Sequence, residues 1–276
     1  MTTQTRLEDI CIRDPYVLPY KDGFVITGTF LENGFGAYFT KDFKICEGPY
    51  VLVDNQDETL NPEVFWAPEL HNYNEKYYLF GTVERLGDKR FSMIYVSENP
   101  LGTFAPVGRC TPEGWQCLDA TLYIEDDEPY AVFCREWVEI SDGEIHAVKL
   151  SKDLSCMLEE PKLLFRATEA KWSKEIGAGT ARGYVTDGPF LFKEDETLKM
   201  LWSSVGKEGY AIATASSDNG RLDGNWIQQE TPFFAKDGGH GMIFERDGQK
   251  YLTIHAPNRP TGAERMVIVD KGDFTW

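Results

Sequence analysis

The sequence predicts an all-β fold, a five-bladed β-propeller with about four antiparallel strands per blade, as a single domain over residues 1–276. Three observations predict it. A hairpin pattern recurs five times at intervals near 50 residues. Other short strand patterns fill the intervals, while helical periodicity of useful length is absent. Aromatic residues, which favour strands, make up 13% of the chain. A β-sandwich, the main alternative, would not explain five similar units.

Each hairpin has a short polar or Pro/Gly anchor, a strand, a polar turn and a second apolar strand. The copies are "RDPYVLPYKDGFVITGT", "WAPELHNYNEKYYLFGTV", "LDATLYIEDDEPYAVFC", "GYVTDGPFLFKEDETLKMLWSS" and "GHGMIFERDGQKYLTIHAP". The equivalent anchors are predicted to be Asp14, Ala67, Asp119, Asp187 and His240. They are 53, 52, 68 and 53 residues apart, and an insertion, "ATEAKWSKEIGAGTARG", explains the long interval. Segments such as "SMIYVSENPLGTF", "EIHAVKLSKDLS" and "YAIATASSDN" supply outer strands of the blades.

The composition excludes several classes of partner. A formal charge of −17 argues against nucleic acid and anionic membranes, and leaves a neutral or cationic small ligand. No apolar run is long enough to span a membrane. The six cysteines form no C-x-x-C pair or zinc spacing, and the start has no signal-peptide pattern. We therefore expect a cytoplasmic protein with reduced cysteines, although removal of a leader would leave the same sequence. The oligomeric state is open.

Three of the predicted anchors are aspartates: Asp14, Asp119 and Asp187. Inner strands of a propeller start near its central channel, so these carboxylates are expected to converge at one mouth of it. Asp-Gly-Pro at 187–189 is also good turn chemistry, but turns do not explain the coincidence of three sites. Converging carboxylates suit glycoside hydrolysis or the binding of a hard cation by oxygen ligands.

Two nearby residues favour a sugar. Trp66, at the second anchor, could stack on a pyranose or furanose ring; the alternative is a core residue that fills the channel. Arg265 follows the last hairpin and could bind substrate; the alternative is an ordinary surface arginine. Glu69, two residues beyond Ala67, could line the pocket or hydrogen-bond to a neighbouring turn.

The chain resembles glycoside hydrolase family 43 over nearly its whole length. The resemblance rests on "RDPY", "WAPEL", "DATLYIEDD", "SENPLGTF" and "GHGMIF", in that order. It implies a five-bladed propeller that hydrolyses arabinofuranosides or xylosides with inversion. Related five-bladed families that act on fructosides and mannosides share the architecture, but their "NDPNG"-like signature is absent here.

The resemblance also implies roles for the aspartates. Asp14 would be the general base that activates water, and Asp119 would tune and orient the general acid. The family's acid is usually the glutamate of an E-G-P motif, and here Asp187 stands in its place. Its carboxyl would sit about 1.5 Å further back, since aspartate is one methylene shorter. Glu175, in the insertion, is the alternative proton donor, unless it is a solvated loop charge.

His240 matches the family's channel histidine, which often lies near a bound cation or a water cluster. We expect no required cofactor, with a structural Ca²⁺ near His240 as the one candidate metal; a purely hydrogen-bonding role for this histidine is the alternative.

The resulting hypothesis is an inverting, exo-acting glycosidase that releases arabinofuranosyl or xylosyl units from small plant-type oligosaccharides. A sugar-binding propeller with impaired catalysis is an alternative suggested by Asp187. A glycoside phosphorylase on the same scaffold is another, and it would need a basic phosphate pocket.

Overall fold

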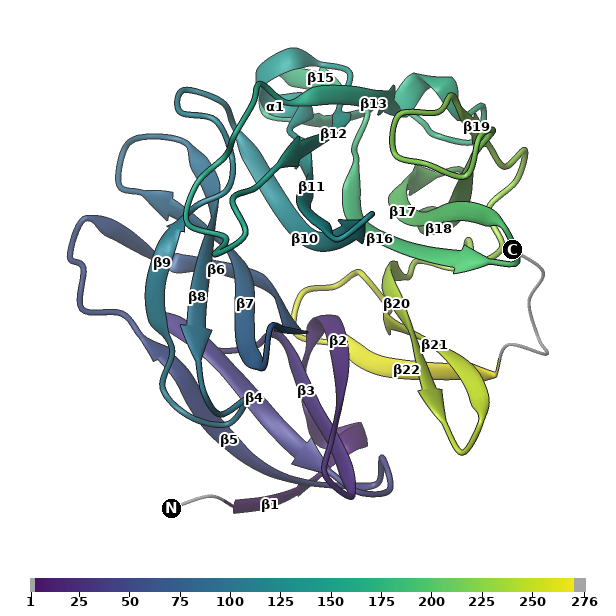
Figure 1. Ribbon diagram of the computed structural model, residues 1–276. Helices are drawn as coiled ribbons and strands as arrows, with labels where there is room; N and C mark the ends of the chain where they lie inside the picture. The colour runs from purple at the N-terminus through teal and green to yellow at the C-terminus, as the bar shows by residue number, and fades with distance from the viewer. Residues whose placement is uncertain (1–2, 271–276) are drawn as a thin grey trace.

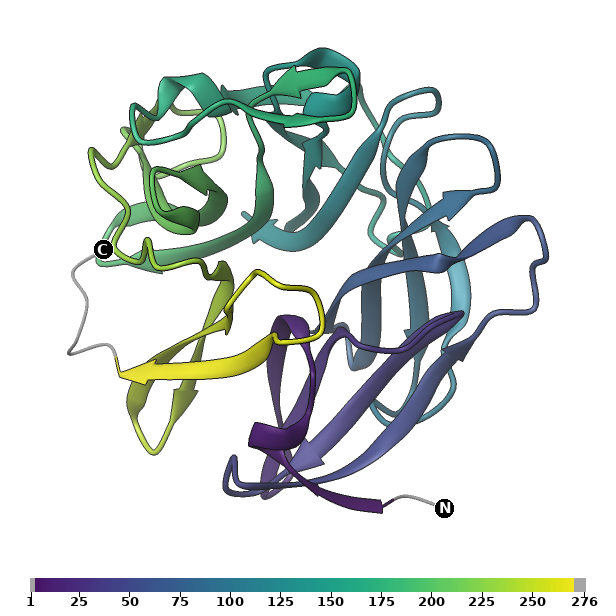
Figure 2. The same cartoon turned by 180° about the vertical axis from the view of Figure 1, so that it is seen from behind.

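Five antiparallel sheets follow one another around the molecule in chain order (Figure 1). The computed structural model describes residues 3–270. The last blade returns to the first, because β20 and β21 contact β2 (Figure 2). The predicted five-bladed β-propeller is confirmed. The predicted single domain also included residues 1–2 and 271–276, which lie outside the described residues.

The first two blades contain nine strands. Blade 1 is the sheet of β1 (Thr3–Arg6), β2 (Arg13–Tyr20), β3 (Gly23–Thr29), β4 (Gly34–Thr40) and β5 (Ile45–Asp54). Blade 2 is the sheet of β6 (Leu60–Tyr73), β7 (Lys76–Arg85), β8 (Arg90–Ser97) and β9 (Ala105–Arg109). The extra strand of blade 1 is β1, which pairs along the outer side of β5.

The remaining blades contain eleven strands among the described residues. Blade 3 is the sheet of β10 (Cys117–Glu125), β11 (Glu128–Arg135), β12 (Glu144–Lys149) and β13 (Lys162–Arg166). Blade 4 is the sheet of β16 (Asp187–Glu194), β17 (Thr197–Gly206), β18 (Gly209–Ser217) and β19 (Trp226–Gln228). Blade 5 is the sheet of β20 (Gly239–Arg246), β21 (Gln249–Ala256) and β22 (Arg265–Asp270). Four strands per blade therefore holds for blades 2 to 4 only.

The predicted insertion folds back onto blade 4. It contains the 3₁₀ helix η2 (Ala167–Glu169) and the hairpin of β14 (Ile176–Ala178) and β15 (Ala181–Gly183). The buried Trp172 packs on Trp202 of blade 4, with ring centroids 5.0 Å apart. The other short helices are η1 (Leu7–Asp9) and α1 (Trp137–Ile140). In residues 3–270, no helix has the length and apolar character needed to cross a membrane.

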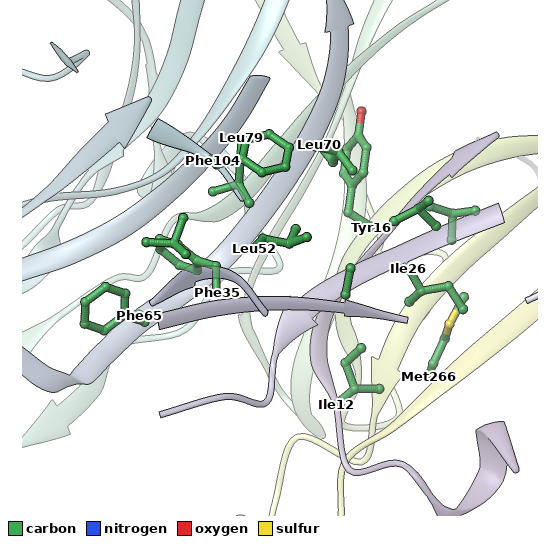
Figure 3. Packing of buried hydrophobic residues seen from close by; sticks show 14 of the residues in the cluster. Ile12, Tyr16, Ile26, Phe35, Leu52, Phe65, Leu70, Leu79, Phe104 and Met266 are labelled. Atoms are coloured by element: carbon green, nitrogen blue, oxygen red, sulfur yellow. The ribbon is translucent and has the colours of Figure 1, made fainter. Parts of the chain in front are cut away.

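The largest apolar cluster joins blade 1 both to blade 2 and to blade 5, the last sheet in the chain. Phe35 of blade 1 lies against Phe65 of blade 2, with ring centroids 5.2 Å apart (Figure 3). Its ring centroid is also 5.8 Å from that of Tyr95 in blade 2. Met266 of the last strand belongs to the same cluster. This packing holds the first and last blades together, so the two ends of the chain jointly build the channel mouth.

Every inner strand contains the same β-bulge, close to the start of β2, β10, β16 and β20 and in the middle of the longer β6. Two residues of the inner strand face one residue of the second strand, at positions 14–15, 67–68, 119–120, 188–189 and 240–241. The first bulged residue has a positive φ in each blade: 51° at Asp14, 45° at Ala67, 54° at Asp119, 54° at Gly188 and 48° at His240. The bulge re-aims these residues at the ends of the inner strands.

The register corrects one predicted anchor. Gly188, not Asp187, is the fourth equivalent residue, because Asp187 is still paired with Ser203 before the bulge begins. A Cβ atom on Gly188 would lie 2.7 Å from Cδ2 of His240. Close packing against this imidazole therefore requires glycine here, and the carboxylate has to stand one residue earlier.

All six cysteines are free thiols, and four of them are buried. This agrees with the expectation of reduced cysteines, since the apolar clusters leave the fold without need of covalent staples.

Removal of the Phe35 ring should open a cavity between blades 1 and 2. Phe35 is 1% exposed, so we expect Phe35→Ala to lower the free energy of unfolding by about 3–5 kcal/mol. Ile227→Ala, at a side chain that is 63% exposed, serves as control and should change it by less than about 0.5 kcal/mol. Urea denaturation of both variants measures this, and equal midpoints would contradict the role given to Phe35.

Candidate active site

Two of the predicted aspartates face one imidazole at the channel mouth. Nδ1 of His240 lies 3.1 Å from Oδ1 of Asp14 and 3.7 Å from Oδ2 of Asp119. The same Asp119 oxygen accepts a hydrogen bond of 3.0 Å from the backbone N–H of Gly188, the residue after Asp187. The bulges of blades 1, 3, 4 and 5 thus bring side chains far apart in sequence into one cluster, as the anchor pattern predicted.

A second ring of side chains holds the bulges in place. In four blades, the backbone N–H of the first bulged residue donates a hydrogen bond to a side chain of the neighbouring blade. That side chain stands at the end of the neighbouring blade's second strand, and it is Thr29, Thr82, Ser203 or His255. Cys134 occupies the corresponding position of blade 3, and there Asp119 accepts the hydrogen bond from Gly188 instead. Asp119 thereby replaces a missing hydroxyl and fixes the backbone beside Asp187.

Asp14 lies in an environment that favours its ionised form. Burial alone would raise its pKa, but the nearby His240, His255 and Arg13 together hold that pKa below the ordinary value of 3.8. Thr29 also donates a hydrogen bond of 2.8 Å to Oδ2 of Asp14. Asp14 is therefore a carboxylate across the range in which the protein would work.

The surroundings of Asp187 and Asp119 instead favour the protonated form of each carboxyl group. Burial raises the pKa of Asp187 to about 6, opposed by His240 and by a hydrogen bond from Tyr210. The negative charges of Glu136 and Asp14 add to the increase. Burial also raises the pKa of Asp119 well above 3.8, against the attraction of His240. Neighbouring carboxyl groups in this cluster therefore differ in protonation near pH 5.

The two histidines of the cluster also differ. Burial would lower the pKa of His240, but the charges of Asp14, Asp119 and Asp187 raise it above 6.5. Burial lowers the pKa of His255 to about 4. A neutral His255 suits its hydrogen bonds, because its Nδ1 accepts from the Asp14 N–H and its Nε2 faces Oδ1 of Asn258 at 3.2 Å.

An arginine absent from the predicted site supports Asp14. Arg13 donates 2.7 Å and 2.8 Å hydrogen bonds to Oδ1 of Asn258 and Oε1 of the buried Glu264. A connected chain then runs from Glu264 through Arg13, Asn258 and His255 to Asp14. This network holds Asp14 in place.

Trp66 is partly exposed, and its ring is in contact with a cation. The Arg90 guanidinium lies over the indole, 5.3 Å from the ring centroid, and forms a bidentate ion pair with the buried Glu136. A sugar could therefore stack only on the other face of Trp66, and the predicted stacking stays a prediction. Arg90 and Glu136 escaped sequence reasoning because neither lies at a repeated anchor.

Glu69 and Arg265 are engaged by other groups. Glu69 is buried and lies 3.0 Å from Nε2 of His71. Arg265 donates to the backbone carbonyls of Glu8, Gly262 and Glu264, so its guanidinium ties η1 to β22. The structure does not bring Arg265 to the aspartates, because its hydrogen-bonding groups are committed to this strand end.

Glu175, the alternative proton donor, is exposed directly before β14 of the insertion. Asp187 is instead in contact with Tyr210, whose hydroxyl donates to Oδ2 at 2.9 Å. The geometry thus favours Asp187 over Glu175 as the acid.

The residues around His240 do not fit Ca²⁺ in this arrangement. Calcium prefers six to eight oxygen ligands, whereas the Asp14 and Asp119 oxygens face an imidazole nitrogen. Over the part of the chain described, no group of three or more His, Cys, Asp or Glu side chains is placed to hold a metal ion. The predicted calcium stays a prediction, and no step below involves a metal.

A comparison with protein families identifies the chain. The profile for glycosyl hydrolases family 43 matches residues 11–275. The chain belongs to this family. The resemblance seen in the sequence is thereby confirmed. No functionally curated protein matched the chain.

Solved structures agree with the assignment to family 43. An endo-arabinase from Bacteroides thetaiotaomicron VPI-5482 is 37% identical, with a TM-score of 0.90 over 96% of this chain and 95% of its own. An α-L-arabinofuranosidase from Lactobacillus brevis is 17% identical, with a TM-score of 0.78 over 99% and 95%. A family 43 β-xylosidase/α-arabinofuranosidase from a compost microbial metagenome, solved with xylotriose, is 15% identical, with a TM-score of 0.72 over 98% and 95%. The last two show the shared fold alone.

The pKa values of this family 43 protein predict a bell-shaped dependence of kcat/KM on pH. If Asp14 is the base and Asp187 the acid, as the family resemblance implies, activity should fall as pH drops below 3.8 and again as pH rises through about 6. Initial rates on an oligosaccharide, whose leaving group needs protonation, between pH 3 and 9 would measure both limbs, once stability over that range is verified. An alkaline limb unchanged in Asp187→Asn would contradict the assignment of this limb to Asp187.

Proposed function

We propose that this glycoside hydrolase is an inverting, exo-acting enzyme that releases arabinofuranosyl or xylosyl units from small oligosaccharides. The observation that carries the proposal is the opposite protonation of two carboxyl groups within one cluster. The pKa of Asp14 is held low while that of Asp187 is raised to about 6. An ionised base and a protonated acid are what single-displacement glycoside hydrolysis requires.

In the proposed reaction, Asp14 takes a proton from a water molecule as the water oxygen bonds to the anomeric carbon. The bond from that carbon to the leaving oxygen breaks, and Asp187 gives this oxygen its proton. Asp14 ends protonated and Asp187 ends ionised, and exchange of one proton with solvent restores both. Asp119 holds the Gly188 N–H at 3.0 Å and so orients the chain beside the acid.

Arabinofuranosyl substrates are the first choice. The relative with 37% identity is described as an endo-arabinase. Its described mode is cleavage within a chain, whereas our proposal is release of terminal units. Early products from a linear arabino-oligosaccharide distinguish the two: monosaccharide alone supports the exo mode, and a mixture of shorter oligosaccharides supports the endo mode.

Charge pairing near the site favours hydrolysis over phosphorolysis. A phosphorylase needs cationic groups to bind phosphate, but Arg13 and Arg90 pair with the buried Glu264 and Glu136. Phosphate-independent turnover would support hydrolysis. Sugar binding without turnover would support the alternative of an impaired, sugar-binding propeller.

The first-formed sugar should have the inverted anomeric configuration, because Asp14 activates water and does not bond to the sugar. Proton NMR during the first minutes of hydrolysis, before mutarotation, measures the anomer. Retention of configuration would mean that Asp14 is a nucleophile.

Loss of the acid should depend on the leaving group. Asp187→Ala should lower turnover of natural oligosaccharides by about 10²–10⁴-fold, the usual share of general acid catalysis. It should retain much more activity on a dinitrophenyl glycoside, whose phenolate leaves without protonation. Steady-state kinetics on both substrates measures the difference.

Two further variants serve as controls. Asp14→Ala should lose both activities alike, since the attacking water needs its base whichever group departs. Glu175→Ala should behave like the unmodified enzyme; a leaving-group-selective loss there, with equal losses in Asp187→Ala, would transfer the acid role to Glu175.

A further inference from the structure

The acid of the proposed mechanism has a hydrogen-bond partner on another strand. The Tyr210 hydroxyl, from β18, donates to Oδ2 of Asp187 at 2.9 Å. We propose that Tyr210 is the positioning residue of the general acid: it fixes Oδ2 and leaves Oδ1 as the oxygen that carries and delivers the proton. This inference rests on the proposed role of Asp187 in glycoside hydrolysis.

Tyr210 is held on several sides. It is 4% exposed, and its ring stacks on the imidazole of His255 with centroids 5.5 Å apart and planes at 19°. Its backbone N–H donates to Oδ1 of Asp237 at 3.2 Å. A buried, stacked phenol has few alternative rotamers, so its hydroxyl is a fixed point for the carboxyl group.

The ring edge also lies close to a glycine that cannot be replaced without movement. A Cβ atom on Gly239 would lie 2.9 Å from Cε1 and 3.0 Å from Cδ1 of Tyr210. Gly239 precedes the blade 5 bulge, just as Asp187 precedes the blade 4 bulge. Because Gly239 has no side chain, there is space for the ring of Tyr210, which hydrogen-bonds to Asp187.

The hydrogen bond has a defined direction. Burial raises the pKa of Tyr210 well above 10, with further increases from the neighbouring aspartates, so the phenol stays protonated and donates. A donor to Oδ2 stabilises the carboxylate that remains after proton transfer. It also leaves the transferable proton on Oδ1, since Oδ2 is occupied as an acceptor.

Several charged groups face Asp187 and would persist in a Tyr210 variant: His240, Glu136 and Asp14, together with Asp119, whose own pKa is raised by the charge of Asp187. Loss of the Tyr210 hydroxyl therefore removes one stabilising contact while the other influences remain. The expected direction is a higher pKa for Asp187, because the hydrogen bond from Tyr210 lowers it.

Tyr210→Phe tests the proposal, since it removes one oxygen and retains the stacked ring. We expect kcat on an arabino-oligosaccharide to fall about 10- to 100-fold, the effect of losing a buried hydrogen bond to a charged group. KM should change little. Activity on the dinitrophenyl glycoside should be largely retained, and the alkaline limb of kcat/KM should move to higher pH.

Tyr251→Phe is the matched control, because its hydroxyl contacts Gln249 at an exposed turn of blade 5. Identical kinetics and pH profiles for Tyr210→Phe and Tyr251→Phe would overturn the proposal. Equal losses on both substrates would also overturn it, since they would indicate a structural role. If Tyr210→Phe fails to fold, Gly239→Ala crowds the ring instead, together with Oγ of Ser203 at 2.8 Å. A leaving-group-selective loss in this variant would support the proposal, and equal losses on both substrates would overturn it.

Different results would contradict the proposed function and the inference about Tyr210. If the unmodified enzyme hydrolyses no glycoside, or if Asp187→Ala shows no dependence on the leaving group, the acid role itself is wrong and the inference falls with it. If both behave as proposed while Tyr210→Phe matches its control, only the inference is wrong.

Discussion

The site depends on one hydrogen bond that is repeated around the ring, from the first bulged N–H of an inner strand to a neighbouring side chain. Four of the five residues in this bulge position are not glycine, yet all have φ between 45° and 54°. Such a conformation costs about 1–2 kcal/mol for an L-residue. The side-chain acceptors at Thr29, Thr82, Ser203 and His255 offset that cost and lock the bulge. Without them the inner strands could continue as regular ladders, and the carboxyl groups would not converge.

Each acceptor lies in one blade and each bulge in the next, so the hydrogen bond couples neighbouring blades. Cys134 stands where the other blades have the acceptor, and there Asp119 accepts the hydrogen bond from the Gly188 N–H instead. The carboxyl group proposed to tune the acid is thus also part of the ring that holds the backbone beside Asp187. This dual use explains how a buried carboxyl group with a raised pKa is tolerated, because its oxygen satisfies a backbone donor that would otherwise lack a partner.

Asp14 and Asp187 differ in protonation because different groups pack around them. Asp14 has cationic and donor groups around it, supplied by blades 1 and 5. Asp187 has burial and neighbouring negative charge, with Tyr210 as its hydrogen-bond donor. Two chemically identical side chains therefore differ in protonation, as the proposed roles of base and acid require, and the difference follows from which blades supply their neighbours.

The sequence by itself determined the five hairpins, because strand alternation and turn residues act between near neighbours in the chain. It also identified Asp14, Asp119 and His240 at the mouth, since equal spacing in a repeat implies equivalent places. Its resemblance to family 43, through motifs such as "RDPY" and "WAPEL", anticipated the family.

The tertiary structure alone decided the rest. The shift from Asp187 to Gly188 depends on the space left by His240, a residue from another blade. The backbone carbonyl partners of Arg265 could not be read from the sequence, and Tyr210 could not be found because no repeat marks it. The ion pairs of Arg13 with Glu264 and of Arg90 with Glu136 join residues that are far apart in the sequence. These contacts form only when the blades pack side by side, so the local sequence pattern could not predict them.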